Sequence, residues 1–270
     1  MILWVIVPAK DPALAKTRLA PALDDEARQR LSLGLLDHTV RAALASSAVA
    51  QVMVVSADDG PLALAVQLGA LPLREALAAP VSALGRQLAP AEVDGVRPDP
   101  ARTAAPADAP VETGLNAALS QARRAALAAG ADAVLVLHAD LPLLTPQAIG
   151  DMVAALRGGA GAVIAPDRHR SGTNALLLRP PAALPFLFGR RSFARHVQAA
   201  WEHDTQYVVA ADPAFAADLD TPEDLAWLEE CAASAGGDHW LRALIAGLDA
   251  ARKPPTPVPT DGRARLRCGR

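Results

Sequence analysis

The sequence predicts an α/β fold with a mostly parallel sheet and helices on both faces. Short apolar runs alternate with longer stretches rich in Ala and Leu along most of the 270 residues, the order that places a helix between neighbouring parallel strands. Aromatic residues make up only 3% of the chain, which argues against an all-β sandwich. Hydrophobic residues make up 51%, enough to bury a sizeable core.

The first strand is expected over Ile2–Val7, an apolar run that ends at Pro8. An acidic start and a stripe of apolar residues predict a helix over 24–46. Further apolar runs predict strands over 49–58 and 71–75, and the stretch between these two predicts a short helix over 60–70.

The second half of the chain continues the alternation. The run Ala133–Leu137 is the strongest strand signal, and Thr145 followed by Pro146 is typical of a helix start. From the same kinds of signal we expect helices over 114–131, 145–158, 191–204, 221–234 and 239–253, and strands over 160–167, 172–180 and 205–212.

Two segments do not follow the alternation. Residues 85–112 are rich in Pro, Ala and Asp and have no apolar period, which indicates an extended insertion. After the helix expected over 239–253, prolines and arginines predict a disordered end. We therefore expect a main domain over residues 1–235 and a C-terminal helix and tail over 236–270.

Charge and composition exclude several classes of protein. The net charge of −3 gives no general field for nucleic acid, so an anion site has to be local. The N-terminus has no basic segment before its short apolar run, and no apolar run of about 18 residues occurs elsewhere. The two cysteines lack the spacing of a disulfide framework or a zinc site. We expect a soluble, cytoplasmic protein that binds neither nucleic acid nor membrane.

The ends of the expected strands carry the charged residues with chemical meaning. Ligands of such sheets bind beyond the carboxyl ends of the strands. Lys10, Lys16 and Arg18 follow the first strand in a loop with little acid, which suits a polyphosphate as well as it suits a solvated basic loop. In an extended loop Lys16 and Arg18 would share one face, and the alternative for Arg18 is that it anchors the loop to Asp24. No GxxxxGK[ST] or GxGxxG motif accompanies this loop.

Asp140 directly follows the strongest strand, where a carboxylate can hold Mg²⁺ against phosphate oxygens. Asp220 precedes the helix expected over 221–234, and its charge lies near the same site if Asp140 lies there. The alternative for Asp140 is a turn cap. Two further loops, `GTN` at 172–174 and `GRRS` at 189–192, offer backbone amides and hydroxyls to a small carboxylate or phosphate.

Together these stretches resemble a known family. The motifs `VPAKDPALAKTRLAP`, `GLNAAL`, `VLHADLPLLTP`, `APDRHRSGTNALLLRP`, `FGRRSFARH` and `DLDTPEDL` occur in the order seen in the 2-phospholactate, phosphoenolpyruvate and 3-phosphoglycerate guanylyltransferases of coenzyme F420 biosynthesis. The resemblance covers about residues 3–230. It implies a Rossmann-like nucleotidyltransferase fold, the substrates GTP and a small phosphorylated acid, and Mg²⁺ as cofactor.

The resemblance also implies roles for particular residues. Lys16, Arg18, Asp140 and Asp220 would be catalytic, and the two aspartates would hold the metal. The nucleotide would be bound by Pro8, Ala9, Lys10, Lys16, Arg18, Gly114 and Asn116. The acid would be held by Thr173, Gly189 and Ser192.

Several alternatives stay open from the sequence. A sugar-phosphate or molybdopterin-type nucleotidyltransferase shares the fold and the basic first loop, and a nucleotide-binding protein without catalysis would share the same residues. Pocket shape, which a sequence does not give, decides which of the three phospho acids is used. The sequence is also compatible with a homodimer.

Overall fold

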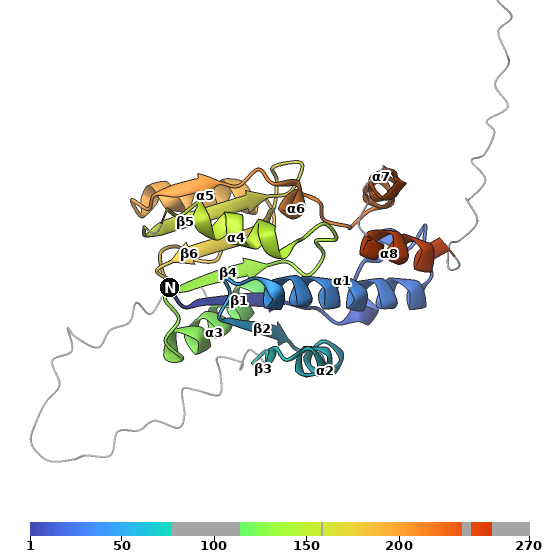
Figure 1. Ribbon diagram of the computed structural model, residues 1–270, viewed down its shortest axis with the longest axis horizontal. Coiled ribbons are helices and arrows are strands. Elements are labelled where there is room, and N and C mark those ends of the chain that lie inside the picture. Colours follow the sequence, from blue (N-terminus) through green and yellow to red (C-terminus); the bar gives the residue numbers. More distant parts are fainter. Residues whose placement is uncertain (77–113, 158, 234–238, 250–270) are drawn as a thin grey trace, which may run out of the picture.

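A seven-stranded sheet runs through the centre of the part that the computed structural model describes, residues 1–76, 114–157, 159–233 and 239–249 (Figure 1). The strands lie in the order β3-β2-β1-β4-β6-β5-β7. Their bounds are β1 Leu3–Pro8, β2 Gln51–Ser56, β3 Leu71–Arg74, β4 Ala133–Leu137, β5 Gly161–Pro166, β6 Thr173–Arg179 and β7 Tyr207–Val209. Every strand expected from the sequence is present.

The sheet is mostly parallel, as predicted. Strand β6 runs antiparallel to both of its neighbours, β4 and β5, while the other pairs are parallel. The chain order turns around between β1 and β4, because β2 and β3 extend the sheet on one side and β4 starts the other side. Such a reversal is the usual place for a ligand in an open α/β sheet.

The helices expected from the sequence also form, with ends shifted by a few residues. Their bounds are α1 Asp25–Ala45, α2 Asp59–Leu68, α3 Leu115–Ala128, α4 Pro146–Ala154, α5 Ser192–Glu202, α7 Pro222–Ala233 and α8 His239–Asp249. A short helix, α6 (Pro213–Ala216), was not expected and begins where the Asp212 carboxylate accepts from the Ala214 N–H. Thr145 caps α4 as predicted, since its hydroxyl accepts from Ala148 N–H.

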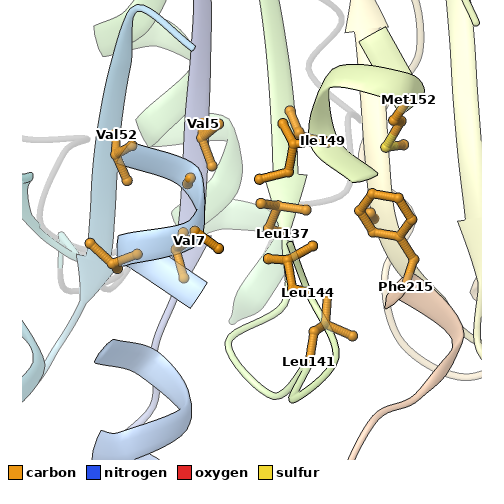
Figure 2. Packing of buried hydrophobic residues seen from close by; sticks show 14 of the residues in the cluster. Val5, Val7, Val52, Leu137, Leu141, Leu144, Ile149, Met152 and Phe215 are labelled. Carbon is orange, nitrogen blue, oxygen red and sulfur yellow. The ribbon is translucent and has the colours of Figure 1, made fainter. Parts of the chain in front are cut away.

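Alternate residues of each central strand enter two different cores. Val5 and Val7 of β1 pack with α1, α2 and α4 on one face (Figure 2), whereas Ile6 packs with α3 and α5 on the other. Burial on both faces explains the unbroken apolar runs of β1 and β4. The sequence expectation of helices on both faces is confirmed.

A third apolar cluster lies beyond the sheet. It joins the N-terminal half of α1 to α7 and α8, with Leu31 and Leu35 meeting Leu228 and Leu241. Figure 1 shows α7 and α8 beside one end of α1, away from the strands. The helix expected over 239–253 therefore exists, while the proposed boundary at residue 235 stays a prediction. The insertion at 85–112 and the tail beyond 249 lie outside the described residues.

None of the described helices combines the length and apolar composition needed to cross a membrane.

Candidate active site

A pocket of about 570 Å³ opens beyond the carboxyl ends of β1, β2 and β4. The loop after β1 forms one wall, and residues from α1, α2 and α3 form the others. The lining contains most of the predicted nucleotide-binding residues, namely Pro8, Ala9, Lys10, Lys16, Arg18 and Gly114, together with Asp140 and Asp220. The pocket thus lies at the reversal of strand order.

Lys16 joins the two predicted metal carboxylates at the floor of this pocket. Its Nζ donates to Asp140 Oδ2 and to Asp220 Oδ1, at 2.8 Å in both cases. The Lys16 side chain is only 8% exposed. Burial alone would lower the pKa of Lys16, but the attraction of Asp140 and Asp220 outweighs it and raises the pKa above the usual value. Lys16 is therefore held as an ammonium between two carboxylates.

The same balance acts on Asp140. Burial would raise the pKa of the carboxyl, but the neighbouring Lys16 ammonium holds it below its ordinary value. Asp140 stays ionised at neutral pH, so its carboxylate can bind a cation.

The loop after β1 does not have the extended conformation that we expected. Lys16 adopts a left-handed backbone, with φ of 54°, and begins a 3-10 helix over Thr17–Leu19. The Lys16 side chain is buried at this turn, whereas Arg18 is exposed, although both line the same pocket. The expectation that Lys16 and Arg18 share one face of an extended loop is therefore wrong.

The guanidinium of Arg18 is available to bind a ligand. The alternative that it anchors the loop to Asp24 is not seen, because Asp24 instead caps α1 by accepting from Ala27 N–H. Among the described residues Arg18 has no ion-pair or hydrogen-bond partner.

Asp220 is held in place by the start of α7. Asp224 Oδ2 accepts from the backbone N–H of Asp220 at 2.9 Å and of Thr221 at 2.7 Å, and Asp224 N–H donates to the Thr221 hydroxyl. These bonds between Thr221 and Asp224 form a capping arrangement at the start of α7. It fixes the backbone that presents the Asp220 carboxylate to Lys16.

A third carboxylate, Asp218, lies close to the pair. Its Oδ1 accepts from Asn174 Nδ2 at 3.3 Å. Burial, together with the negative charge of Asp140, raises the pKa of Asp218 to about 6. The backbone N–H of Leu219 donates to the Asp140 carbonyl at 3.2 Å, which ties this segment to the end of β4.

The carboxylates fit a magnesium ion in one specific respect. Asp140 Oδ1 is buried and has no hydrogen-bond partner among the described residues, and an unpaired buried carboxylate oxygen is costly unless a cation completes it. No group of three or more protein ligands for a metal occurs in the described part of the chain. Mg²⁺ fits such a site, because it takes one or two carboxylates and completes its shell with water and phosphate oxygens.

His138 also faces this region. It lines the pocket and its Nε2 is buried without a partner among the described residues. Burial, only partly offset by the charge of Asp140, lowers the pKa of His138. The neutral ring packs near Phe188, with 5.3 Å between ring centroids.

The predicted acid-binding residues come together beside the pocket, though they are not part of its lining. Thr173 N–H donates to Ser192 Oγ at 2.8 Å, and Ser192 N–H donates to the Gly189 carbonyl. Thr173 and Ser192 are buried residues, 1% and 2% exposed. Ser192 begins α5, whose N-terminus favours an anion. Their role in holding the acid stays a prediction.

Asn116 is placed differently from the other predicted nucleotide residues. Its amide donates to the Phe188 carbonyl at 3.1 Å and accepts from the Phe188 N–H at 2.9 Å. Asn116 therefore joins α3 to the loop before α5 and does not line the pocket.

Sequence reasoning missed several lining residues. Ser32 and Leu33 of α1 and Pro61 of α2 carried no signal, because packing decides which face of a helix meets a pocket. Glu75 did carry one, since it directly follows β3 and the carboxyl ends of parallel strands point to the ligand.

The fold is a Rossmann-like α/β fold with a charged cluster at the place where such sheets bind ligands. A structure from Desulfovibrio desulfuricans G20, described as a nucleotide-diphospho-sugar transferase, superposes with a TM-score of 0.66 at 14% identity and covers 93% of this chain and 97% of that one. A cytidylyltransferase from Leptospira borgpetersenii gives a TM-score of 0.52 at 13% identity, covering 93% and 94%. These likenesses support the fold alone.

The chain belongs to the guanylyl transferase CofC-like family, whose model matches residues 105–251. A phosphoenolpyruvate guanylyltransferase from Rubrobacter xylanophilus is 41% identical over 229 residues, 85% of this chain and 94% of the relative. A 3-phospho-D-glycerate guanylyltransferase from Colwellia psychrerythraea is 29% identical over 221 residues, 82% and 88%. The family, the fold and the class of enzyme expected from the sequence are confirmed.

Proposed function

We propose that the protein joins the GMP unit of GTP to the phosphate of a three-carbon phospho acid and releases pyrophosphate, as a step of coenzyme F420 biosynthesis. The observation that carries the proposal is the contact of Lys16 with both Asp140 and Asp220 inside a pocket at the strand-order reversal. The names of the relatives favour phosphoenolpyruvate as the acid over 3-phosphoglycerate and 2-phospholactate.

The reaction forms one bond and breaks one. A phosphate oxygen of the acid attacks the α-phosphorus of GTP, and the bond from that phosphorus to the oxygen bridging to the β-phosphate breaks. The electron pair leaves with pyrophosphate, and the acid becomes linked to GMP through a diphosphate. Because the attacking oxygen is already an anion near neutral pH, no strong general base is needed.

The task of the protein is then to hold two polyanions in line and to balance their charge. Lys16 supplies a fixed ammonium at the pocket floor, and Arg18 supplies a fork that can bind two phosphate oxygens. Asp140 and Asp220 would hold Mg²⁺, which when bound neutralises charge on phosphate oxygens. The N-terminus of α5, with Ser192 and Thr173, would orient the acid.

Product identification tests the proposal. The protein is incubated with GTP, Mg²⁺ and phosphoenolpyruvate, 2-phospholactate or 3-phosphoglycerate in turn, with the downstream deazaflavin acceptor system present to trap an unstable product. Mass analysis is expected to find the guanylylated acid or, where the acceptor has trapped it, the acid joined to the deazaflavin with GMP released. Pyrophosphate is expected in an amount equal to the sum of the two. GTP binding without pyrophosphate release, with any of the acids, would show instead a nucleotide-binding protein without this activity.

A further inference from the structure

The pocket is lined by one acidic side chain, Glu75, that makes no contact with Lys16, Asp140 or Asp220 in the hydrogen bonds and ion pairs of the described residues. Glu75 directly follows β3 and is half-buried, whereas Asp140 and Asp220 lie beyond β4 and before α7. Both of those aspartates are bound by Lys16, but the Glu75 carboxylate has no hydrogen-bond or ion-pair partner among the described residues. This carboxylate is free to accept from a ligand.

The backbone around Glu75 is fixed on several sides. The N–H of Glu75 donates to the Ser56 carbonyl at 2.8 Å. The side-chain amide of Gln121 accepts from Ala76 N–H and donates to the Arg74 carbonyl, each at 2.9 Å. The Arg74 guanidinium in turn donates to the Ala57 carbonyl at 2.8 Å. These hydrogen bonds hold the backbone on both sides of Glu75 in place, and so fix the position of Glu75 in the pocket lining.

The walls near this end suit a flat, apolar ring. The lining here includes Val55 at the end of β2, Pro61 at the start of α2, and Leu115 and Ala118 of α3. The other charged lining residues come from elsewhere, namely the loop after β1, the end of β4 and the segment before α7. A nucleotide with its phosphates at Lys16 would therefore place its base among the apolar side chains.

The sheet geometry sets the span between the two ends. Strand β3 lies three positions from β4 in the sheet, which corresponds to roughly 14 Å at the usual strand spacing. An extended nucleotide covers a span of this order between its α-phosphate and the far edge of its base, once a contact distance is added at each end.

We propose that the Glu75 carboxylate reads the guanine base, by accepting from the ring N1–H and from the 2-amino group. The proposal rests on the function proposed above and names a residue that gives it base specificity. Guanine presents two adjacent donors on this edge and can pair with both carboxylate oxygens. Adenine presents an acceptor at N1, which a carboxylate repels, so ATP would be rejected.

Inosine triphosphate is the sharpest probe, because it keeps N1–H and lacks only the 2-amino group. We measure kcat/KM with saturating acid for GTP and ITP in the wild type, Glu75→Gln and Glu75→Ala. The wild type is expected to prefer GTP by on the order of 10-fold to 100-fold, the size of one hydrogen bond to a charged group. Glu75→Ala is expected to lower this ratio to about one, because it presents no acceptor. Glu75→Gln is expected to lower it in part, because one neutral carbonyl oxygen replaces two charged oxygens.

The matched control is Glu223→Gln, which removes an exposed carboxylate of α7 that does not line the pocket. It is expected to keep the GTP/ITP ratio of the wild type. Melting curves of all variants show whether they fold. The GTP/ITP ratio of kcat/KM in the wild type is measured without any variant. A wild type that uses GTP and ITP equally would therefore overturn the proposal.

Failure of this inference differs from failure of the proposed function. If the wild type makes the guanylylated acid but Glu75→Gln keeps the full preference for GTP, the role of Glu75 is wrong and the function stands. If no acid is guanylylated, calorimetric titration of GTP and ITP measures the same ratio from binding alone. In that case an equal loss of affinity for both nucleotides in Glu75→Ala would overturn the base-reading role.

Discussion

The ammonium of Lys16 lies 2.8 Å from the carboxylate of Asp140, although 124 residues separate the two in the chain. Lys16 comes from the loop after β1 and Asp140 follows β4, and these strands are neighbours in the sheet. The fold therefore builds the charged centre of the pocket from two adjacent strand ends, to which the segment before α7 adds Asp220.

Replacement of Lys16 tests how this cluster balances its charge. Lys16→Met leaves Asp140 and Asp220 facing each other without a cation. We expect the free energy of unfolding to fall by on the order of 2 kcal/mol, less than for a fully buried pair because Asp220 is 40% exposed. Added Mg²⁺ is expected to restore part of this loss. Melting curves with and without Mg²⁺ measure both effects.

The control for that experiment is Lys10→Met, since Lys10 is an exposed cation of the same pocket. It should leave the melting temperature nearly unchanged. If Lys16→Met melts like the wild type, or if Mg²⁺ does not help it, the cluster does not need a cation between its carboxylates.

Arg18 is expected to contribute to nucleotide binding and little to stability, because it is exposed and unpaired among the described residues. Arg18→Ala should weaken GTP binding by about tenfold, the effect of losing roughly one charge-assisted hydrogen bond. Arg18→Lys should restore this only in part, because a lysine cannot bind two oxygens in one plane. Calorimetric titration of GTP measures both, with Arg124→Ala of the exposed face of α3 as control. A fall in melting temperature without a loss of GTP affinity would make Arg18 a structural residue.

Ser192 is expected to act on the acid and not on GTP. Ser192→Ala should raise KM for the acid severalfold and leave KM for GTP nearly unchanged. It should also lower stability, because the buried Thr173 N–H loses its acceptor, at a cost of about 1–3 kcal/mol. Steady-state kinetics with each substrate varied in turn separate these effects, and Ser171→Ala serves as an exposed control. A larger rise in KM for GTP would mean that the two substrates were assigned to the wrong places.

The buried His196 gives the fold a defined response to pH. Its Nε2 accepts from Leu187 N–H, so its Nδ1 carries the proton and donates to the Thr173 hydroxyl. Burial, together with nearby Arg195, lowers the pKa of His196 to about 4. The unfolded chain takes up this proton near pH 6.5. The contribution of His196 to stability is therefore complete above pH 6.5 and lost as the pH falls toward 4.

This loss amounts to about 3 kcal/mol over that range. Denaturant unfolding at several pH values measures it as the difference between the wild type and His196→Gln, which cannot titrate. The exposed His203→Gln should keep the wild-type dependence on pH. Parallel pH profiles for the wild type and His196→Gln would mean that the ring is not held neutral.

Most of the fold followed from the sequence, because each central strand is an unbroken apolar run with a clear turn at its end. The direction of β6 was harder to predict, since apolar runs look the same in either direction. A signal existed in the connection over residues 167–172, which is too short for a crossover helix and so requires antiparallel pairing.

The site was predictable where a charge directly follows a strand. Asp140 and the basic loop after β1 could be identified in this way. The different exposure of Lys16 and Arg18 could not, because the loop turns at the left-handed backbone of Lys16, a conformation that a lysine rarely adopts. The hydrogen bonds of Asn116 with Phe188 could not be predicted either, since they join segments that lie 72 residues apart in the chain.

We propose that nucleotidyl transfer depends on the negative charge of Asp140. Asp140→Asn tests this role because it keeps the size of the side chain and removes its charge. Pyrophosphate release is measured with GTP, phosphoenolpyruvate and Mg²⁺ for the wild type, Asp140→Asn and the control Asp151→Asn, an exposed carboxylate of α4. We predict a loss of turnover on the order of a hundredfold or more in Asp140→Asn, and none in the control. A folded Asp140→Asn protein that releases pyrophosphate at nearly the wild-type rate would show that transfer does not depend on this charge.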